Sequence, residues 1–459
     1  MRAGPNRVYC WFLSHCAARA SRPTQLRASV RPARRDADSP SLRYAISDNN
    51  TRNEFRHVAH VNPANPYHFF ATVPISMSSN AQAPIIVIAP DSFKGSLSAP
   101  EVAQAIASGI ARVLPQADLR LRPMADGGEG TLDALLSAGG RRVPLSVRGA
   151  GKASVMAEYG VMPDGTGVLE SANVVSITDP VGMQTPVAER STVGLGELLR
   201  ALLDTGARRV LIGLGGSSTN DGGAGLLVGL GARLLDDTGA EVQPVPAALH
   251  RVASIDLNGL DARLKDCELV AMSDVNNPLN GTQGATAIFG PQKGVSEAQV
   301  EPLDRAIAHF AGHAHRAFNA SEAASRAGAG AAGGLGFALH LLGAQFRSGA
   351  EVVAERVGLP QAVDGADWLI TGEGRSDGQT LSGKTPMIAA QVAIKGGATA
   401  SLLSGAIDRG ALESLSRVFS GCFSLTFGPT TLEKAIADAA GLLADSAEQM
   451  ARLRYTHKG

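Results

Sequence analysis

The side chains best suited to chemistry stand in polar turns that directly follow apolar runs. The first turn follows Ile85–Ala89 and contains Asp91, Ser92, Lys94 and Ser96. The apolar run has the length of a strand, and apolar residues after the turn recur at helical spacing. In α/β proteins ligands bind at such strand ends, where a lysine can hold a phosphate and an aspartate a metal ion or a hydroxyl. The turn is therefore a candidate ligand site, and an ordinary turn with a solvated lysine is the alternative.

Two further segments have the same character. Ala125–Thr131 carries Asp126 among glycines, and Gly213–Gly225 follows the strand-like run Arg209–Ile212. Glycine-rich loops let backbone N–H groups converge on an anion, and hydroxyls add further donors. The residues expected to bind a ligand in the second segment are Gly215, Gly216, Ser217, Ser218, Thr219 and Asn220, and Asp221 is expected to bind substrate or act as a base. A flexible turn whose glycines only permit tight packing is the alternative.

A third candidate loop, Ser273–Gly294, comes directly after the apolar run Leu269–Met272. It contains Asp274, Asn276 and Lys293. Asp and Asn at a strand end are suited to orienting hydroxyls or holding a divalent cation. A plain Asx turn is the alternative interpretation.

The fourth loop, Gly372–Pro386, is dense in charge and contains a literal P-loop pattern. Its candidate binding residues are Glu373, Arg375 and Lys384. Gly378–Thr385 matches G-x-x-x-x-G-K-T, but six residues separate Thr371, where the strand-like run ends, from Gly378. A P-loop glycine follows its strand almost directly, and Pro386 is tolerable only in the first turn of a helix. We therefore interpret the segment as one ligand loop rather than a P-loop.

Weaker motifs receive structural interpretations. Ala327–Gly334 contains G-x-G-x-x-G, but no credible strand precedes it, so helix packing or a helix N-terminus facing a ligand is favoured over a dinucleotide site. His309, His313 and His315 lie on an expected helix with an irregular exit, which does not favour a metal site. The four cysteines have no metal-ligand spacing, which indicates a reducing, cytoplasmic location and no structural zinc.

Composition separates the first 83 residues from the rest of the chain. Residues 1–83 contain eleven arginines, no lysine and four acidic residues, hence a charge of +7. The whole chain has 42 basic and 42 acidic residues, so the remainder carries −7, which argues against non-specific nucleic-acid binding. A transit peptide, a disordered tail and a true start at Met77 are the three interpretations of this stretch, and we favour the last. No run approaches about 18 apolar residues, so we expect no membrane span.

From Pro84 onward, strand-like runs alternate with segments of helical period, which predicts an α/β fold of parallel sheets covered by helices. Strands are expected at Ile85–Ala89, Val168–Glu170, Arg209–Ile212, Leu269–Met272 and Trp368–Thr371. Helices are expected at Glu101–Val113, Gly130–Leu136, Leu195–Asp204, Glu297–Ala311, Met387–Ala393 and Leu432–Arg454. Gly139–Ala157 mixes valine and arginine without helical period and is expected to open a different structural unit.

Taken together, these loops supply glycine-rich anion cradles, lysines in turns and aspartates after strands, which is the inventory that phosphoryl transfer requires. From Ile85 to Arg454 the chain resembles the bacterial glycerate kinase family, whose members phosphorylate D-glycerate with ATP. The matching stretches are Ala89–Ala99, Met124–Leu132, Gly213–Gly225, Ser273–Gly294, Gly328–Gly349 and Thr371–Pro386. The N-terminal extension departs from the family.

The resemblance implies two α/β domains with a cleft between them. One, residues 84–144 plus 331–459, would be Rossmann- or flavodoxin-like and built from both chain ends, and residues 145–330 would form the second. It also implies ATP, Mg²⁺ and glycerate as ligands, with 2-phosphoglycerate as the favoured product. A homodimer is a further expectation, and neither nucleic acid nor a membrane is an expected partner.

Under this resemblance, the candidate residues take specific roles. Lys94 would contact phosphate or the transition state, and either Asp126 or Asp221 would accept the hydroxyl proton. Asp274 and Glu373 are candidate Mg²⁺ ligands. Lys293, Arg375 and Lys384 would clamp the glycerate carboxylate or the ATP phosphates. The rival functions are a kinase of another small hydroxy or sugar acid, a true P-loop NTPase, and a catalytically inactive glycerate-binding protein.

Overall fold

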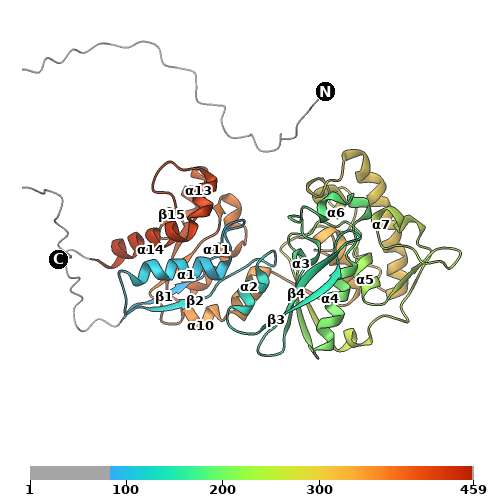
Figure 1. The fold of residues 1–459 in the computed structure, drawn as a ribbon, viewed down its shortest axis with the longest axis horizontal. Coiled ribbons are helices and arrows are strands. Elements are labelled where there is room, and N and C mark those ends of the chain that lie inside the picture. The colour runs from blue at the N-terminus through green and yellow to red at the C-terminus, as the bar shows by residue number, and fades with distance from the viewer. Residues whose placement is uncertain (1–82, 457–459) are drawn as a thin grey trace, which may run out of the picture. The chain divides into compact units, whose positions relative to one another are not determined.

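The computed structural model describes residues 83–456, which form two large β-sheets and the helices that cover them (Figure 1). The expectations for the N-terminal extension and for a start at Met77 lie outside the described residues. Among residues 83–456, no helix has both the length and the apolar character needed to cross a membrane.

The first sheet contains five parallel strands in the order β15-β13-β11-β1-β2. Their bounds are β1 Ile85–Ile88, β2 Asp118–Leu121, β11 Trp368–Thr371, β13 Thr399–Ser404 and β15 Cys422–Ser424. Counted along the chain from the β2 edge, the order is 2-1-3-4-5, as in flavodoxin-like folds, and the topological switch point lies between β1 and β11. The expected flavodoxin-like sheet drawn from both chain ends is therefore confirmed.

Helices from the two chain ends cover one face of this sheet. In Figure 1, α1 (Ala99–Ala111) and α14 (Ala439–Tyr455) lie side by side. Ile86 and Ile88 of β1 share a core with both helices, whereas Val87 between them faces the opposite core. A strand buried on both faces reads as a continuous apolar run, which is why it stands out in the sequence.

The single helix expected at Leu432–Arg454 is wrong in one respect. The segment forms α13 (Leu432–Ala437) and α14, separated at Asp438. Asp438 has φ −113° and ψ 22°, which lie outside the helical region, so the chain changes direction there.

The second sheet contains six strands in the order β10-β9-β6-β5-β4-β3. Their bounds are β3 Arg141–Arg148, β4 Ser154–Val161, β5 Gly167–Glu170, β6 Arg209–Gly213, β9 Glu268–Met272 and β10 Gln345–Arg347. β3 and β4 form an antiparallel pair, and β5, β6, β9 and β10 are parallel to one another. The segment expected to open a different unit is thus the first hairpin of this sheet. The domain limits at 144 and 330 stay a prediction, and the strands of this sheet extend from Arg141 to Arg347.

Several helices and short elements complete the two layers. The remaining α-helices are α2 Thr131–Leu136, α3 Ala172–Val175, α4 Val193–Asp204, α5 Ala224–Gly229, α6 Ala285–Phe289, α7 Glu297–Phe318, α8 Leu335–Leu341, α9 Gly349–Arg356, α10 Leu359–Val363, α11 Thr385–Lys395 and α12 Leu412–Leu415. Two small sheets pair β7 Arg233–Leu235 with β8 Ser254–Asp256, and β12 Arg375–Ser376 with β14 Ala406–Ile407. Val87 and Leu369 of the first sheet share one core with Val168 and Leu211 of the second, so the two sheets are packed through a common apolar cluster.

Candidate active site

The loop between β2 and α2, residues Asp126–Thr131, runs along the carboxyl ends of the parallel strands of the second sheet. The Gly127 carbonyl accepts a hydrogen bond of 3.1 Å from the N–H of Gly215, which follows β6. A Cβ on Gly127 would lie 2.9 Å from the carbonyl oxygen of Met272, the last residue of β9, and its φ is +89°. A Cβ on Gly349, just after β10, would lie 2.0 Å from the Asp126 carbonyl oxygen. Glycine at these positions therefore permits a close backbone approach that a side chain would block.

Three carboxylates from three strand ends gather at this loop. Burial, and then the charge of Asp126, raises the pKa of Asp91 to about 7. Partial desolvation, and then the charge of Asp126, also raises the pKa of Asp274, although Asp274 stays open to solvent at its surface. The charge of Asp126 thus acts on both of the other carboxylates. Its Oδ1 accepts a 2.9 Å hydrogen bond from the N–H of Gly128.

The Lys94 turn and the Gly372–Pro386 loop lie together at the switch point of the first sheet. The N–H of Asp91 donates to the Gly372 carbonyl at 2.8 Å. A Cβ on Gly374 would lie 3.6 Å from the Cα of Phe93. Lys94 is exposed. The structure therefore brings the first and fourth candidate loops together, as their places after neighbouring strands predict.

The polar residues beside Lys94 have local partners. Ser92 donates from its N–H and its hydroxyl to Asp91 Oδ1, at 2.6 and 3.3 Å. Ser96 donates from its hydroxyl to the Ile436 carbonyl at 3.2 Å. Both serines are half-buried. They shape the turn, and Ser92 also orients the Asp91 carboxylate.

The fourth loop differs from a P-loop in its local structure. β12 stands between β11 and Gly378, and a 3₁₀ turn at Gly378–Leu381 precedes Lys384, which caps α11. Pro386 occupies the first turn of α11, the one place where a helix tolerates it. Arg375 is exposed and Lys384 is half-buried.

Glu373 is held by hydroxyls of its own loop. Its Oε1 accepts hydrogen bonds of 3.0 Å from Ser376 and 2.7 Å from Thr380. Burial raises its pKa above the usual range. Within residues 83–456, no group of three or more His, Cys, Asp or Glu side chains is arranged to hold a metal ion.

The glycine-rich loop after β6 is accessible only at its start. Gly216 is exposed and Gly215 half-buried, while Ser217 keeps 5% of its surface. Ser218, Thr219, Asn220 and Asp221, which the sequence also places in the site, are completely buried. Ser218 donates to the Val175 carbonyl at 3.0 Å, and Asn220 Nδ2 donates to Thr286 Oγ1 at 3.0 Å.

Asp221 braces the inside of this loop. Its Oδ2 accepts from the N–H and the hydroxyl of Thr192, at 2.7 and 2.8 Å, and from the N–H of Gly225 at 3.2 Å. Its Oδ1 accepts from the N–H of Gly223 at 3.0 Å. Burial raises its pKa. Both oxygens are therefore occupied by donors of the protein itself.

Two cations lie beneath the same loop. Lys293, with 2% of its surface exposed, donates from Nζ to the Thr219 carbonyl at 2.7 Å and to Ser217 Oγ at 3.1 Å. Arg190, with 3% exposed, donates from Nη1 to the carbonyls of Ser218 and Lys293, at 3.0 and 2.9 Å. Burial lowers the pKa of Lys293 to about 7. Arg190 carries no sequence signal, because it stands in a plain turn between a 3₁₀ turn and α4.

The G-x-G-x-x-G motif packs against backbone of the neighbouring loops. Gly330 donates its N–H to the Asn277 carbonyl at 2.9 Å, and a Cβ on Gly333 would lie 2.0 Å from the Thr219 carbonyl oxygen. The G-x-G-x-x-G motif thus packs against two site loops, which confirms the packing interpretation. Asn276 is exposed at the surface of the third loop.

A polar cavity of about 340 Å³ opens beside the exposed start of the glycine-rich loop. It is lined by Glu129, Val155, Ala172, Asn173, Val174, Ser176, Thr178 and Asp179. The N–H of Ile177 donates to the Gly216 carbonyl at 2.8 Å, so this wall is attached to the loop. The cavity thus extends the site along the ends of β5 and β6.

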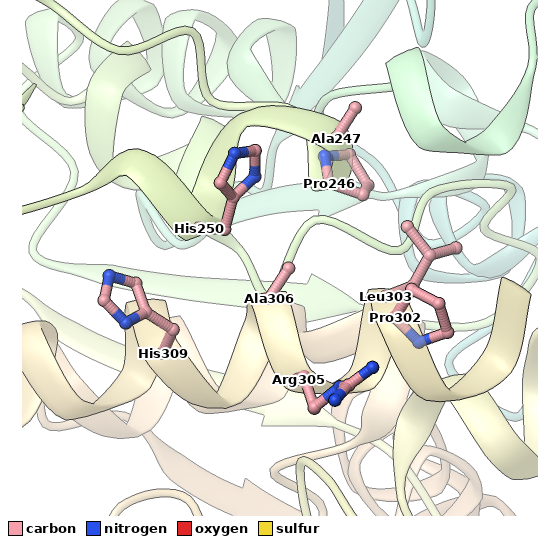
Figure 2. Close-up of a pocket in the computed structure, with 8 residues that line it drawn as sticks. All are labelled: Pro246, Ala247, His250, Pro302, Leu303, Arg305, Ala306 and His309. Carbon is pink, nitrogen blue, oxygen red and sulfur yellow. The ribbon is translucent and has the colours of Figure 1, made fainter.

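A larger cavity, about 400 Å³, lies elsewhere, between α7 and the 3₁₀ turn Pro246–Arg251 (Figure 2). His250 and His309 stand on its walls, and none of the candidate site residues lines it. His309 Nε2 is 2.7 Å from the Val252 carbonyl oxygen, and His315 Nε2 accepts from the N–H of Ala324 at 3.3 Å. His309 and His315 thus contact backbone groups, and the candidate site residues lie elsewhere, at the strand ends.

An α/β architecture with lysine and glycine loops beside carboxylates at strand ends is the architecture of a small-molecule phosphotransferase. Comparison with known proteins gives the same class. The glycerate kinase family matches residues 86–455, and the chain belongs to this family. It is 44% identical to the glycerate kinase of Bacillus subtilis (strain 168) over 370 residues, which are 80% of this chain and 96% of that protein.

Other relatives agree. The chain is 44% identical over 314 residues to the glycerate 2-kinase of Escherichia coli (strain K12), covering 68% of this chain and 82% of that one. A crystal structure described as a candidate glycerate kinase 2 from Salmonella typhimurium LT2 superposes with a TM-score of 0.72 at 40% identity. That match covers 81% of this chain and 98% of the other.

Proposed function

We propose that this chain transfers the γ-phosphate of ATP to D-glycerate, giving ADP and phosphoglycerate, with the 2-hydroxyl as the acceptor. The observation that carries the proposal is the convergence of the Lys94 turn, the Asp126 loop and the start of the glycine-rich loop at strand ends of both sheets. Positioning and charge neutralisation dominate phosphoryl transfer, and these groups supply both. The E. coli relative named a glycerate 2-kinase supports the choice of hydroxyl.

In this proposal, Lys94 and the N–H groups of Gly216 and Ser217 hold the oxygens of the transferred phosphoryl group. Arg375 and Lys384 hold the glycerate carboxylate or the outer phosphates, and Asn276 contributes a polar contact. We assign the hydroxyl proton to Asp126 rather than Asp221, because both oxygens of Asp221 already accept protein hydrogen bonds. Lys293 and the buried part of the loop then act by shaping it.

The carboxylates of Asp274 and Glu373 suit a Mg²⁺ ion that is bound together with the phosphates of a nucleotide. Mg²⁺ usually takes one or two protein carboxylates, several waters and the phosphates of the substrate, so a site needs no three-carboxylate cage. Asp274 is open to solvent and electrostatically coupled to Asp126, and it would hold the ion. Glu373 remains the second candidate ligand. The ion would neutralise phosphate charge.

The decisive assay mixes the purified chain with ATP, Mg²⁺ and a panel of small hydroxy acids and sugar acids, and identifies the product by ³¹P and ¹³C NMR. We expect phosphate on the 2-hydroxyl of D-glycerate. Turnover of a different acid alone would establish the alternative kinase. Glycerate binding without ATP consumption would establish the inactive binding protein.

Asp126→Asn tests the base. We expect kcat to fall by about 10²- to 10⁴-fold, the range for loss of a general base, with little change in folding. Asp237→Asn is the matched control, because Asp237 is exposed on the turn that follows β7. If Asp126→Asn retained parental kcat while Asp221→Asn folded but lost activity, the assignment would be reversed.

A further inference from the structure

The dipeptide Glu170–Ser171 at the carboxyl end of β5 touches both of the loops that meet at the site. Glu170 keeps 4% of its surface exposed and Ser171 none. Neither residue belongs to a motif that the sequence singles out. Their side chains nevertheless form hydrogen bonds to the start of α2, directly after the Asp126–Thr131 loop, and to the glycine-rich loop.

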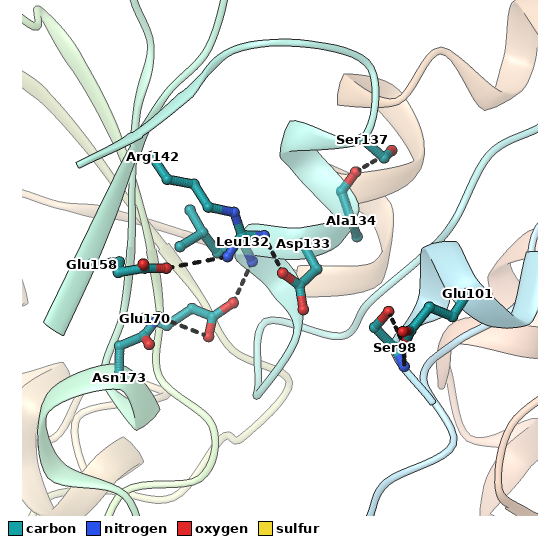
Figure 3. Close-up of polar contacts among 10 residues, drawn as sticks. All are labelled: Ser98, Glu101, Leu132, Asp133, Ala134, Ser137, Arg142, Glu158, Glu170 and Asn173. Carbon is teal, nitrogen blue, oxygen red and sulfur yellow. Dashed lines mark hydrogen bonds and ion pairs between the residues drawn. The ribbon is translucent and has the colours of Figure 1, made fainter. Parts of the chain in front are cut away.

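Glu170 holds the end of the Asp126–Thr131 loop, where it enters α2 (Figure 3). Its Oε1 accepts a hydrogen bond from the N–H of Leu132, the second residue of α2. Asn173 Nδ2 donates to Oε2 at 3.3 Å. The first N–H groups of a helix lack partners within the helix, so a buried carboxylate there satisfies them and fixes the helix start.

Ser171 holds the glycine-rich loop. Its hydroxyl donates to the Gly215 carbonyl at 3.0 Å, and its N–H donates to the Gly213 carbonyl at 2.8 Å. Gly215 in turn donates its N–H to the Gly127 carbonyl at 3.1 Å. The two loops are joined by the hydrogen bond between Gly127 and Gly215. Glu170 and Ser171 therefore hold the backbone on both sides of this hydrogen bond.

We propose that Glu170 and Ser171 are positioning residues that fix the distance between the proton-accepting Asp126 loop and the phosphate-binding start of the glycine-rich loop. The proposal rests on the proposed kinase function, since it assigns no ligand contact to either residue. Loss of the hydrogen bonds made by Glu170 and Ser171 would leave every ligand-binding group present but displaced. Displacement by about 1 Å can cost roughly 10²-fold in rate.

The surroundings of Glu170 add a pH signature. Burial raises its pKa to about 7, and the charges of Asp133 and Glu129 contribute in the same direction. Arg142, the cation on this side, pairs instead with Asp133 and with Glu158. Protonation would weaken the carboxylate as an acceptor for the N–H of Leu132.

The test compares Glu170→Gln and Ser171→Ala with the parent chain. We expect each to lower kcat by about 10- to 100-fold while the KM values for ATP and D-glycerate change less than about twofold. Glu170→Gln should also weaken the acid-side fall of kcat that begins near pH 7. Glu158→Gln is the matched control, because Glu158 is a more exposed carboxylate on β4 that pairs with Arg142; it should retain parental kcat.

Hydrogen–deuterium exchange supplies a readout that does not depend on catalysis. In Glu170→Gln the N–H of Leu132 should exchange faster than in the parent, whereas Glu158→Gln should leave it unchanged. Parental exchange, or parental kcat in a folded Glu170→Gln protein, would overturn the proposal. If the parent itself phosphorylates no glycerate, the proposed function fails. The exchange experiment still decides whether Glu170 holds the start of α2.

Discussion

The loops of the two sheets use their cations in opposite ways. In the first sheet, Lys94 and Arg375 are exposed and Lys384 is half-buried, and none of the three forms an ion pair with the described residues. In the second sheet, Lys293 and Arg190 are buried and donate to protein oxygens under the glycine-rich loop. The first set faces solvent and is open to a ligand, whereas the second set is turned toward the protein interior.

The difference teaches that a lysine in a glycine-rich turn can serve either chemistry or architecture. An exposed ammonium can exchange water for phosphate oxygens, and the resulting charge-assisted bonds are strong. A buried ammonium has already lost its water, so its charge must be satisfied by fixed acceptors. Thr219 and Ser217 provide those acceptors for Lys293, which explains how a loop with so many glycines keeps one shape.

Among substitutions of the exposed and the buried cations, Lys94→Ala should produce the larger fall in kcat. We expect kcat to fall by about 10²- to 10³-fold, as when one preorganised donor to a transition state is removed, with unchanged thermal unfolding. Steady-state turnover and a melting curve measure the two quantities. Lys395→Ala, at the exposed C-terminal end of α11, is the matched control. Near-parental turnover of Lys94→Ala would show that Lys94 does not take part in phosphoryl transfer.

Lys293→Met should act on stability and activity together. The substitution keeps the length of the side chain but leaves the Thr219 carbonyl without its donor. We expect the free energy of unfolding to fall by about 1 kcal/mol, since the unmade hydrogen bond is partly offset by removal of a buried charge. We also expect kcat to fall by about tenfold as the loop loosens. Urea denaturation and steady-state kinetics measure these changes.

Lys265→Met is the control for this experiment, because Lys265 is exposed near the same sheet. A stable Lys293→Met protein with a raised KM and an unchanged kcat would contradict the positioning role. That outcome would place Lys293 in contact with substrate, as the sequence pattern suggests.

The sequence predicts strand ends well because apolar runs and turn residues are local signals. Ile85–Ala89 and Trp368–Thr371 are recognisable without the fold, and the chain order of the loops already places them on one sheet edge. The direction in which a side chain points is a tertiary property. Lys94 and Lys293 both stand in glycine-containing turns, and only packing reveals that one faces solvent and the other the interior.

Residues that act through other residues leave even less local signal. Glu170 is the last residue of an apolar strand, and its partner Leu132 lies 38 residues earlier in the chain. Arg190 bonds to carbonyls up to 103 positions away. Such contacts depend on how the sheets are packed, so they require coordinates rather than periodicity.

The stability of the protein should also show a pair of opposite pH dependences. Folding raises the pKa of Asp91 to about 7, so its contribution to stability is complete below about pH 4 and is lost as the pH rises through 7. Folding lowers the pKa of Lys293 to about 7, so its contribution is complete above about pH 10.5 and is lost as the pH falls through 7. The free energy of unfolding should therefore fall with pH below pH 7 because of Asp91 and rise with pH above pH 7 because of Lys293. Each slope is at most about 1.4 kcal/mol per pH unit.

Urea unfolding of the parent, Asp91→Asn and Lys293→Met from pH 5 to pH 9 measures both slopes. The parent's stability relative to Asp91→Asn should fall between pH 5 and 7, and relative to Lys293→Met it should rise between pH 7 and 9. Parallel curves for parent and Lys293→Met would mean that Lys293 keeps its ordinary pKa, which requires hydration. The contrast between an open cation set and a buried one would then disappear, because a hydrated Lys293 would be as available to a ligand as Lys94.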